Sequence, residues 1–172
     1  MVRVRIPATS ANLGAGFDSL GLAVNLYNYV DMEESDGVFI SSTDGTWVPT
    51  TKENLIYQSA QRLYDECGKK LCGLRIIQQN NIPMTRGLGS SSACIVGGLA
   101  AANQMLGNPL GLDDMVGLAS DIEGHPDNTT PALLGGIVTA VLEEGKVFWV
   151  KQEVHSALRL IAVIPDFKLS TE

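Results

Sequence analysis

Apolar and polar positions alternate with a period of two in several short stretches of the chain. The first is Val2 to Ile6, where aliphatic and charged residues alternate as in a half-buried β-strand. Other runs rich in aliphatic residues and bounded by turn residues predict further strands. These runs are 26–34, 37–42, 74–79, 137–142, 147–150 and 158–164.

Other stretches have the apolar spacing of an α-helix. The first runs from residue 55 to about residue 67, and Asn54 is suited to cap its N-terminus. The same criteria predict two more helices, at 90–106 and 112–122. Segments rich in Gly, Ser, Asn and Pro predict two long loops, 8–21 and 123–136. Helices and strands mix along the chain, which predicts an α and β protein.

The composition narrows the class of protein. The chain has 172 residues, of which 45% are hydrophobic and 18% charged, so it can bury a sizeable core and form one compact domain. Its formal net charge is -7. Proteins that bind nucleic acid need a basic face to release counterions from phosphates, so no nucleic acid is expected as a partner.

The cysteines and the N-terminal residues indicate the cellular compartment in which the protein is expected. The three cysteines, Cys67, Cys72 and Cys94, contain no CxxC pair, which fits a reducing compartment better than a disulfide framework. The first residues lack the continuous apolar stretch of a signal peptide, and no segment reaches the roughly 18 apolar residues that a membrane helix needs. We therefore expect a soluble cytoplasmic protein without membrane association.

The sequence GLGSSSA, residues 87–93, is costly for folding yet stands directly at the start of a predicted helix. A helix start has unpaired N–H groups and partial positive charge, which suits it to bind an anion. Gly87 and Gly89 would let the backbone wrap closely around an oxygen-rich anion, and the serines would add donors or a metal ligand. The alternative is that Ser90 is only an N-cap and the glycines form a turn.

The common phosphate-loop pattern is missing from this chain. Neither Gly68-Lys69-Lys70 nor Gly145-Lys146-Val147 has the Ser or Thr that must follow Lys in GxxxxGK[ST]. A nucleotide site here would belong to another class.

The segment from Pro83 to Ala93 resembles the phosphate-binding motif of the GHMP kinases, a family of small-molecule kinases. The resemblance makes every residue of this motif an expected nucleotide contact: Pro83, Met84, Thr85, Arg86, Gly87, Leu88, Gly89, Ser90, Ser91, Ser92 and Ala93. Two more segments, 6–23 and 123–128, resemble the branch of this family that acts on L-homoserine. Ala15 departs from that branch, which usually has Pro at this position.

The resemblance also implies a fold. It is an α+β domain like domain 2 of ribosomal protein S5, with a mostly antiparallel sheet backed by helices and a left-handed βαβ crossover, where the general rule favours the right-handed one. Residues 1–172 would form the N-terminal, ATP-binding domain. Relatives carry a second, C-terminal domain, so we expect the chain to be an N-terminal part that is inactive alone.

The activity that the resemblance implies is phosphoryl transfer from ATP to the hydroxyl of L-homoserine, on the route to threonine, with Mg²⁺. Similarity to the family assigns Ser90 and Glu123 to the metal, and Mg²⁺ usually takes only one or two protein oxygens. Glu123 could instead be a solvated carboxylate at a helix end, although a negative charge is unfavourable there. A homodimer is left open as the assembly.

Four residues match substrate-binding positions of the family. Asp18 can pair with the ammonium group of the substrate, and Asn12 offers both a donor and an acceptor. His125 and Asn128 match the family in the segment 123–128. Each has a plainer alternative: a turn residue in the left-handed conformation for Asn12, a local cap for Asp18 and a structural role for His125.

The proton acceptor of the reaction is not evident from the sequence. Asn128 stands where related kinases place Asp, and an amide cannot accept a proton at neutral pH, so its catalytic role would be to orient the substrate. Asp127 is adjacent, but neighbouring side chains seldom point the same way. The simplest hypothesis is that the hydroxyl proton passes to a phosphate oxygen.

Two other functions stay open at this stage. One is another GHMP kinase, acting on a mevalonate-type substrate or a sugar alcohol. Such substrates carry no ammonium group, which would leave Asp18 without a partner. The other is a nucleotide-binding module without catalysis, although all three motifs keep their polar groups.

Overall fold

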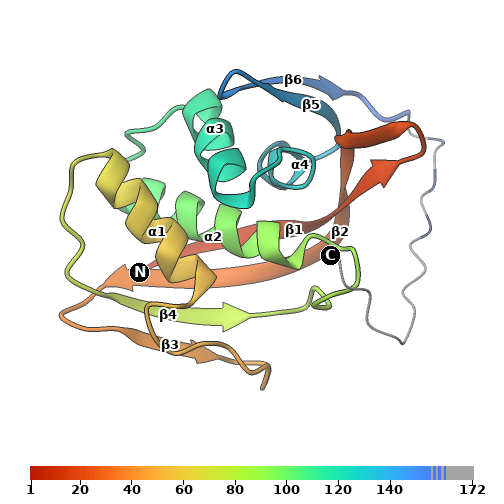
Figure 1. Ribbon diagram of the computed structural model, residues 1–172. Coiled ribbons are helices and arrows are strands. Elements are labelled where there is room, and N and C mark those ends of the chain that lie inside the picture. The colour runs from red at the N-terminus through yellow and green to blue at the C-terminus, as the bar shows by residue number, and fades with distance from the viewer. Residues whose placement is uncertain (156, 158, 160, 162–172) are drawn as a thin grey trace.

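A mixed six-stranded sheet with helices packed on it forms the frame of the protein (Figure 1). The computed structural model describes residues 1–155, 157, 159 and 161. In these residues the strands are β1 (Val2–Leu13), β2 (Gly16–Glu34), β3 (Phe39–Ser42), β4 (Leu74–Gln79), β5 (Ile137–Glu143) and β6 (Lys146–Gln152). The helices are α1 (Leu55–Glu66), α2 (Ser90–Met105), α3 (Leu112–Glu123) and α4 (Thr129–Leu134).

Strand β2 organises the sheet because it pairs with three other strands. It is antiparallel to β1, to β4 and to β5, and β5 continues antiparallel to β6. Only the pair β3 and β4 is parallel among the described strands, and α1 connects these two. The expected α+β class with a mostly antiparallel sheet is therefore confirmed. The hand of the crossover through α1 stays a prediction.

The loop predicted at 8–21 is wrong. These residues form the end of β1 and the start of β2, joined by a tight turn at 14–15. Backbone pairing between the two strands overrides the low strand propensity of Gly, Ser and Asn here. The pairing slips between Ala11 and Leu13, and Asn12 in that irregular step has φ 58. The Gly-rich and Asn-rich composition therefore marks an irregular hairpin end instead of an open loop.

The loop predicted at 123–136 is wrong in part, because it contains the short helix α4. Pro131 lies in the first turn of α4, where its missing N–H costs no helix hydrogen bond, and Gly135 ends the helix. The other helices and the strands from β3 to β6 lie within a few residues of their predicted positions. The strand predicted at 158–164 falls mainly on residues outside the described part of the chain.

Helix α2 is the centre of the core. Most of its residues are buried, and it packs against α1 on one side and against β1 and β2 on another. The backbones of α1 and α2 approach closely at Gly98, where an added Cβ would lie 2.4 Å from the carbonyl oxygen of Ile56. Only glycine allows this contact, and it fixes the position of α2 relative to α1.

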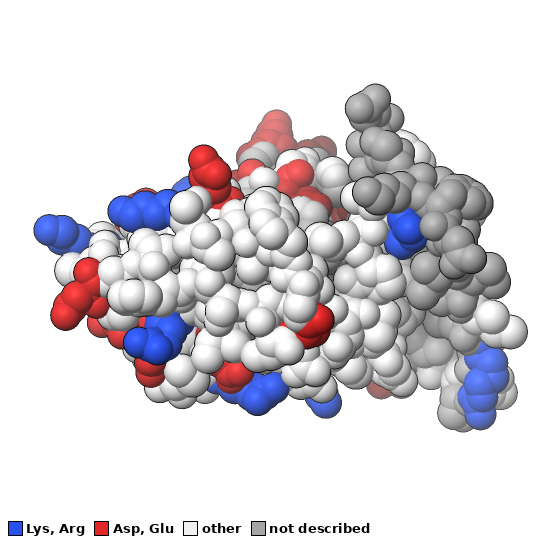
Figure 2. Space-filling view, turned by 90° about the horizontal axis from the view of Figure 1, so that it is seen from below, with Lys and Arg blue, Asp and Glu red and all other residues white. Residues whose placement is uncertain are grey.

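Charged side chains of both signs are spread over the face seen from below in Figure 2, mainly around its rim, with uncharged residues between them. Several arginines lie over aromatic rings: the guanidinium of Arg3 is 5.1 Å from the ring centre of Tyr29, and that of Arg5 is 4.5 Å from Tyr27. Among the helices that the structure describes, none is both long and apolar enough to cross a bilayer.

We expect Gly98→Ala to destabilise the protein by about 1–3 kcal/mol, because the new methyl group would push α2 away from α1. Gly117 on α3 is the matched control, since an added Cβ there meets no atom within 4 Å. Gly117→Ala should stabilise the protein by about 0.5–1 kcal/mol through higher helix propensity. Urea unfolding measures both values, and equal effects of the two changes would contradict the close packing of α1 on α2.

Candidate active site

The segment 83–93 forms a loop that leads into α2. Gly89 is the N-cap of α2 and has φ 64, and Gly87 has φ 67; both values lie in the left-handed region. The first helical hydrogen bond runs from the amide of Ala93 to the carbonyl of Gly89, at 2.8 Å. The glycines therefore turn the chain sharply just before the helix, which is the role that the alternative interpretation gave them.

The amides at the start of α2 have no protein partner. In the part of the chain that the structure describes, the N–H groups of residues 87–92 donate to no carbonyl and to no side chain. Gly89 has no side chain to cap the helix, so the alternative in which Ser90 is the N-cap is wrong. Unpaired amides at a helix N-terminus, with their partial positive charge, can hold an anion.

The residues of this loop divide into two groups. Leu88 is 7% exposed and Ala93 is 1% exposed, so their side chains belong to the hydrophobic core and only their backbone faces the loop. Met84, Thr85, Gly87 and Ser91 are exposed, and Ser92 is buried. The remaining residues of the loop are partly exposed. Leu88 and Ala93 thus anchor the loop to the core.

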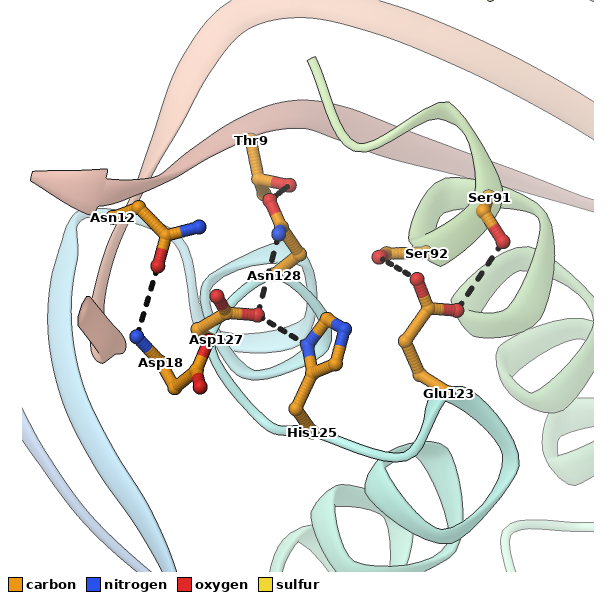
Figure 3. Close-up of polar contacts among 9 residues, drawn as sticks. All are labelled: Thr9, Asn12, Asp18, Ser91, Ser92, Glu123, His125, Asp127 and Asn128. Carbon is orange, nitrogen blue, oxygen red and sulfur yellow. Dashed lines mark hydrogen bonds and ion pairs between the residues drawn. The ribbon is translucent and has the colours of Figure 1, made fainter. Parts of the chain in front are cut away.

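Glu123, the last residue of α3, faces the start of α2. Its two carboxylate oxygens accept hydrogen bonds from Ser91 Oγ at 3.2 Å and from Ser92 Oγ at 3.0 Å (Figure 3). These serines, and not Ser90, are the hydroxyls that contact Glu123 among the described residues. The sequence did not single out Ser91 and Ser92 for this contact, since the resemblance placed Ser90 with the metal.

The oxygen atoms around Glu123 are suited to a hard cation. No group of three or more His, Cys, Asp or Glu that could hold a metal occurs in the described residues. One carboxylate with hydroxyl neighbours is nevertheless the kind of donor set that Mg²⁺ takes from a protein when phosphates and water supply its other ligands. Ser90 and Glu123 stay predicted ligands.

A hydrogen-bonded network lies beside this carboxylate. His125 Nδ1 is 2.6 Å from Asp127 Oδ1, and Asn128 Nδ2 donates to the same oxygen at 3.3 Å. Because a carboxylate at neutral pH only accepts, Nδ1 of His125 carries the hydrogen in this pair. Asp127 is 1% exposed, whereas 46% of the His125 side chain is exposed. In Figure 3 the ring of His125 lies between Asp127 and Glu123.

The expectation that the side chains of Asp127 and Asn128 point apart is wrong. Both turn into the same network, since Asn128 Nδ2 donates to Asp127 Oδ1. Asp127 is therefore part of the site, although the sequence did not predict a role for it. The sequence EGHPDN contains the signal: Asp127 is a carboxylate two residues after a histidine, within reach of its ring.

Asn12 and Asp18 lie together at the irregular end of the hairpin of β1 and β2. Both have left-handed φ values, 58 and 53, and the backbone N–H of Asp18 donates to Asn12 Oδ1 at 2.9 Å. The alternative for Asn12, a turn residue in the left-handed conformation, therefore fits as well as a binding role. Because this bond uses one lone pair of Oδ1, Asn12 presents mainly its N–H groups outward, while the carboxylate of Asp18 is exposed.

One hollow of the surface lies away from these residues. It measures about 660 Å³ between α1, α3 and the hairpin of β5 and β6, and its lining includes Arg62, Asp113 and Trp149. No residue that the sequence predicts for the site lines it. The predicted site residues lie instead around the start of α2, the end of α3 and the β1–β2 hairpin.

Residues 54–136 match the family profile described as GHMP kinases N terminal domain. Two proteins named homoserine kinase, from Petrotoga mobilis and Caldicellulosiruptor bescii, are 47% and 49% identical to the chain and cover 100% of it. The chain is therefore similar to the N-terminal domain of the GHMP kinases. The crystal structure of homoserine kinase from Cytophaga hutchinsonii superimposes with a TM-score of 0.75 at 32% identity, over 90% of this chain and 52% of that one.

The chain corresponds to the N-terminal part of these relatives. It spans 57% of the length of the proteins from Petrotoga mobilis and Caldicellulosiruptor bescii. The match to the family profile includes the loop before α2, Glu123, His125, Asp127 and Asn128, whereas Asn12 and Asp18 lie before it.

Cys94 on α2 reports the environment behind the loop of residues 83–93. Burial, together with the negative charge of Glu123, raises the pKa of Cys94 to about 11. At pH 8 about one Cys94 in a thousand is then a thiolate, the reactive form. We expect iodoacetamide to alkylate the exposed Cys72 at pH 8 while Cys94 stays unmodified, as measured by peptide mass mapping.

The effect of the Glu123 charge on the pKa of Cys94 can be tested with iodoacetamide as well. Glu123→Gln should speed alkylation of Cys94, because the pKa of the Cys94 thiol falls when the negative charge is removed. Burial should still keep the alkylation of Cys94 slower than that of Cys72. Unfolding in urea should make both cysteines react alike. Equal rates for Cys72 and Cys94 in the folded protein would contradict the buried position of the thiol.

Proposed function

We propose that the protein acts in the phosphorylation of L-homoserine by ATP, giving O-phospho-L-homoserine for threonine biosynthesis in the cytoplasm. The observation that carries this proposal is the row of unpaired amides at the start of α2, facing Glu123 and the network around Asp127. The identity of 47–49% with proteins named homoserine kinase supports the choice of substrate.

In this proposal the phosphates of ATP bind at the loop of residues 87–92. The amides and the hydroxyl of Ser90 would stabilise charge that develops on the transferred phosphoryl group, which is the main task of a protein in this chemistry. Mg²⁺ would be held by Glu123 with Ser90 and would neutralise phosphate charge. The hydroxyls of Ser91 and Ser92 keep the Glu123 carboxylate in place.

The amino acid would be bound by groups of complementary charge and hydrogen-bonding type. The exposed carboxylate of Asp18 would pair with its ammonium group, and the N–H groups of Asn12 would donate to its oxygens. His125 and Asn128 would contact it from the opposite side, with Asn128 orienting the hydroxyl towards the phosphate. A mevalonate-type or sugar substrate would leave Asp18 without its partner.

The test is a substrate panel with the full-length product of the gene, assayed beside the 172-residue chain. ATP, Mg²⁺ and one of L-homoserine, mevalonate, shikimate or galactose are supplied, and both ADP and the phosphorylated product are measured. We expect turnover with L-homoserine and a requirement for Mg²⁺. Turnover confined to another acceptor, or ATP binding without any turnover, would overturn the proposed function.

We expect Asp18→Asn to lower kcat/KM for L-homoserine about 10- to 100-fold, because a charge-assisted hydrogen bond contributes about 1.5–3 kcal/mol. The KM for ATP should not change. Asp36→Asn is the matched control, since Asp36 is also exposed but lies outside the site. Equal activity of the two variants would contradict the pairing of Asp18 with the ammonium group.

A further inference from the structure

Thr9 on β1 joins three segments of the site that are far apart in the sequence. Its side chain is fully buried, at 0% exposure. Its hydroxyl donates to Asn128 Oδ1 at 2.8 Å (Figure 3). Its backbone N–H donates to the carbonyl of Leu88 at 3.1 Å. The same residue therefore contacts both the loop before α2 and the residue that caps α4.

The contact with the loop depends on the missing side chain of Gly89. A Cβ on Gly89 would lie 2.0 Å from Thr9 Oγ1 and 3.3 Å from Asn128 Oδ1. The hydroxyl of Thr9 thus fills the space that any larger residue at position 89 would need. Gly89, Thr9 and Asn128 meet at one point, directly at the N-terminus of α2.

The hydrogen bonds at this point fix the direction of the Asn128 amide. Asp127 can only accept, so the NH₂ group of Asn128 must face Asp127. The amide oxygen then faces Thr9, whose hydroxyl donates to it. With only one of these two hydrogen bonds, the amide group could still rotate about that bond. With both in place, one N–H and one lone pair of Asn128 stay free at fixed positions.

We propose that Thr9 is a positioning residue for the phosphoryl transfer: its hydroxyl holds the Asn128 amide in one orientation beside the phosphate-binding loop. This inference rests on the proposed function. Asn128 contacts the acceptor substrate, and Thr9 acts through Asn128. Because Thr9 also bonds to the backbone at Leu88, it sets the distance between the acceptor-binding amide and the amides that bind phosphate.

Such a role should affect the rate more than the binding of ATP. Small misplacements of reacting groups can cost about 10²-fold in rate, whereas the amides at the start of α2 do not need the hydroxyl of Thr9 to bind phosphates. A residue that only fills space would show a different pattern, because a side chain of the same shape would replace it without loss of rate.

The experiment compares Thr9→Val, which keeps the shape but loses the hydroxyl, with Thr9→Ser, which keeps the hydroxyl, in the full-length gene product. Thr139→Val is the control, because Thr139 is exposed on β5, outside the site. kcat, both KM values and the melting temperature are measured. We expect Thr9→Val to lower kcat about 10- to 100-fold with the KM for ATP within twofold, and Thr9→Ser to restore most of the rate.

The outcomes separate this inference from the proposed function. If the unchanged protein does not phosphorylate L-homoserine, the proposed function fails and this inference fails with it. If the unchanged protein is active and Thr9→Val keeps kcat within twofold, only the role of Thr9 is overturned. Equal losses in Thr9→Val and Thr9→Ser, matched by equal losses of melting temperature, would also overturn it. A crystal structure of active Thr9→Val with the Asn128 amide unmoved would do the same.

Discussion

The amide groups at the start of α2 are left without partners inside the protein, and the rest of the site is arranged around them. Every α-helix starts with amides that lack a partner within the helix, and in this arrangement no side chain caps them. The core keeps it in place: Leu88 and Ala93 are buried on either side of the turn, and Gly98 lets α2 pack closely on α1. These core contacts hold the start of α2 in a fixed position.

Topology brings the other parts of the site to this helix end. Strand β2 pairs with β1 and with β5, so the β1–β2 hairpin that carries Asn12 and Asp18 lies near the segment between α3 and β5. The end of α3 supplies Glu123, and that segment supplies His125, Asp127 and Asn128. Thr9 then bonds to both the helix start and Asn128. Segments separated by more than a hundred residues therefore meet through a few short hydrogen bonds.

The sequence was most informative where local chemistry decides the structure. Asn54 caps α1 as predicted, with Oδ1 accepting from the amide of Ile56 at 3.0 Å, and Gly87 and Gly89 form the turn before α2. Long-range pairing was out of reach: residues 8–21 are strands because β1 and β2 pair, not because of their own propensity. The contacts of Thr9 with Asn128, and of Ser91 and Ser92 with Glu123, join distant segments and leave no local pattern. The contact between the side chains of Asp127 and Asn128 was also missed.

The direct test of the central claim is an NMR titration of the ¹⁵N-labelled protein with a non-hydrolysable ATP analogue and Mg²⁺. The account predicts that the amides of residues 87–92 shift most, because the phosphates bond to them, and that residues around the hollow between α1 and α3 change little. Strong shifts around that hollow, with the amides of residues 87–92 unchanged, would contradict the account.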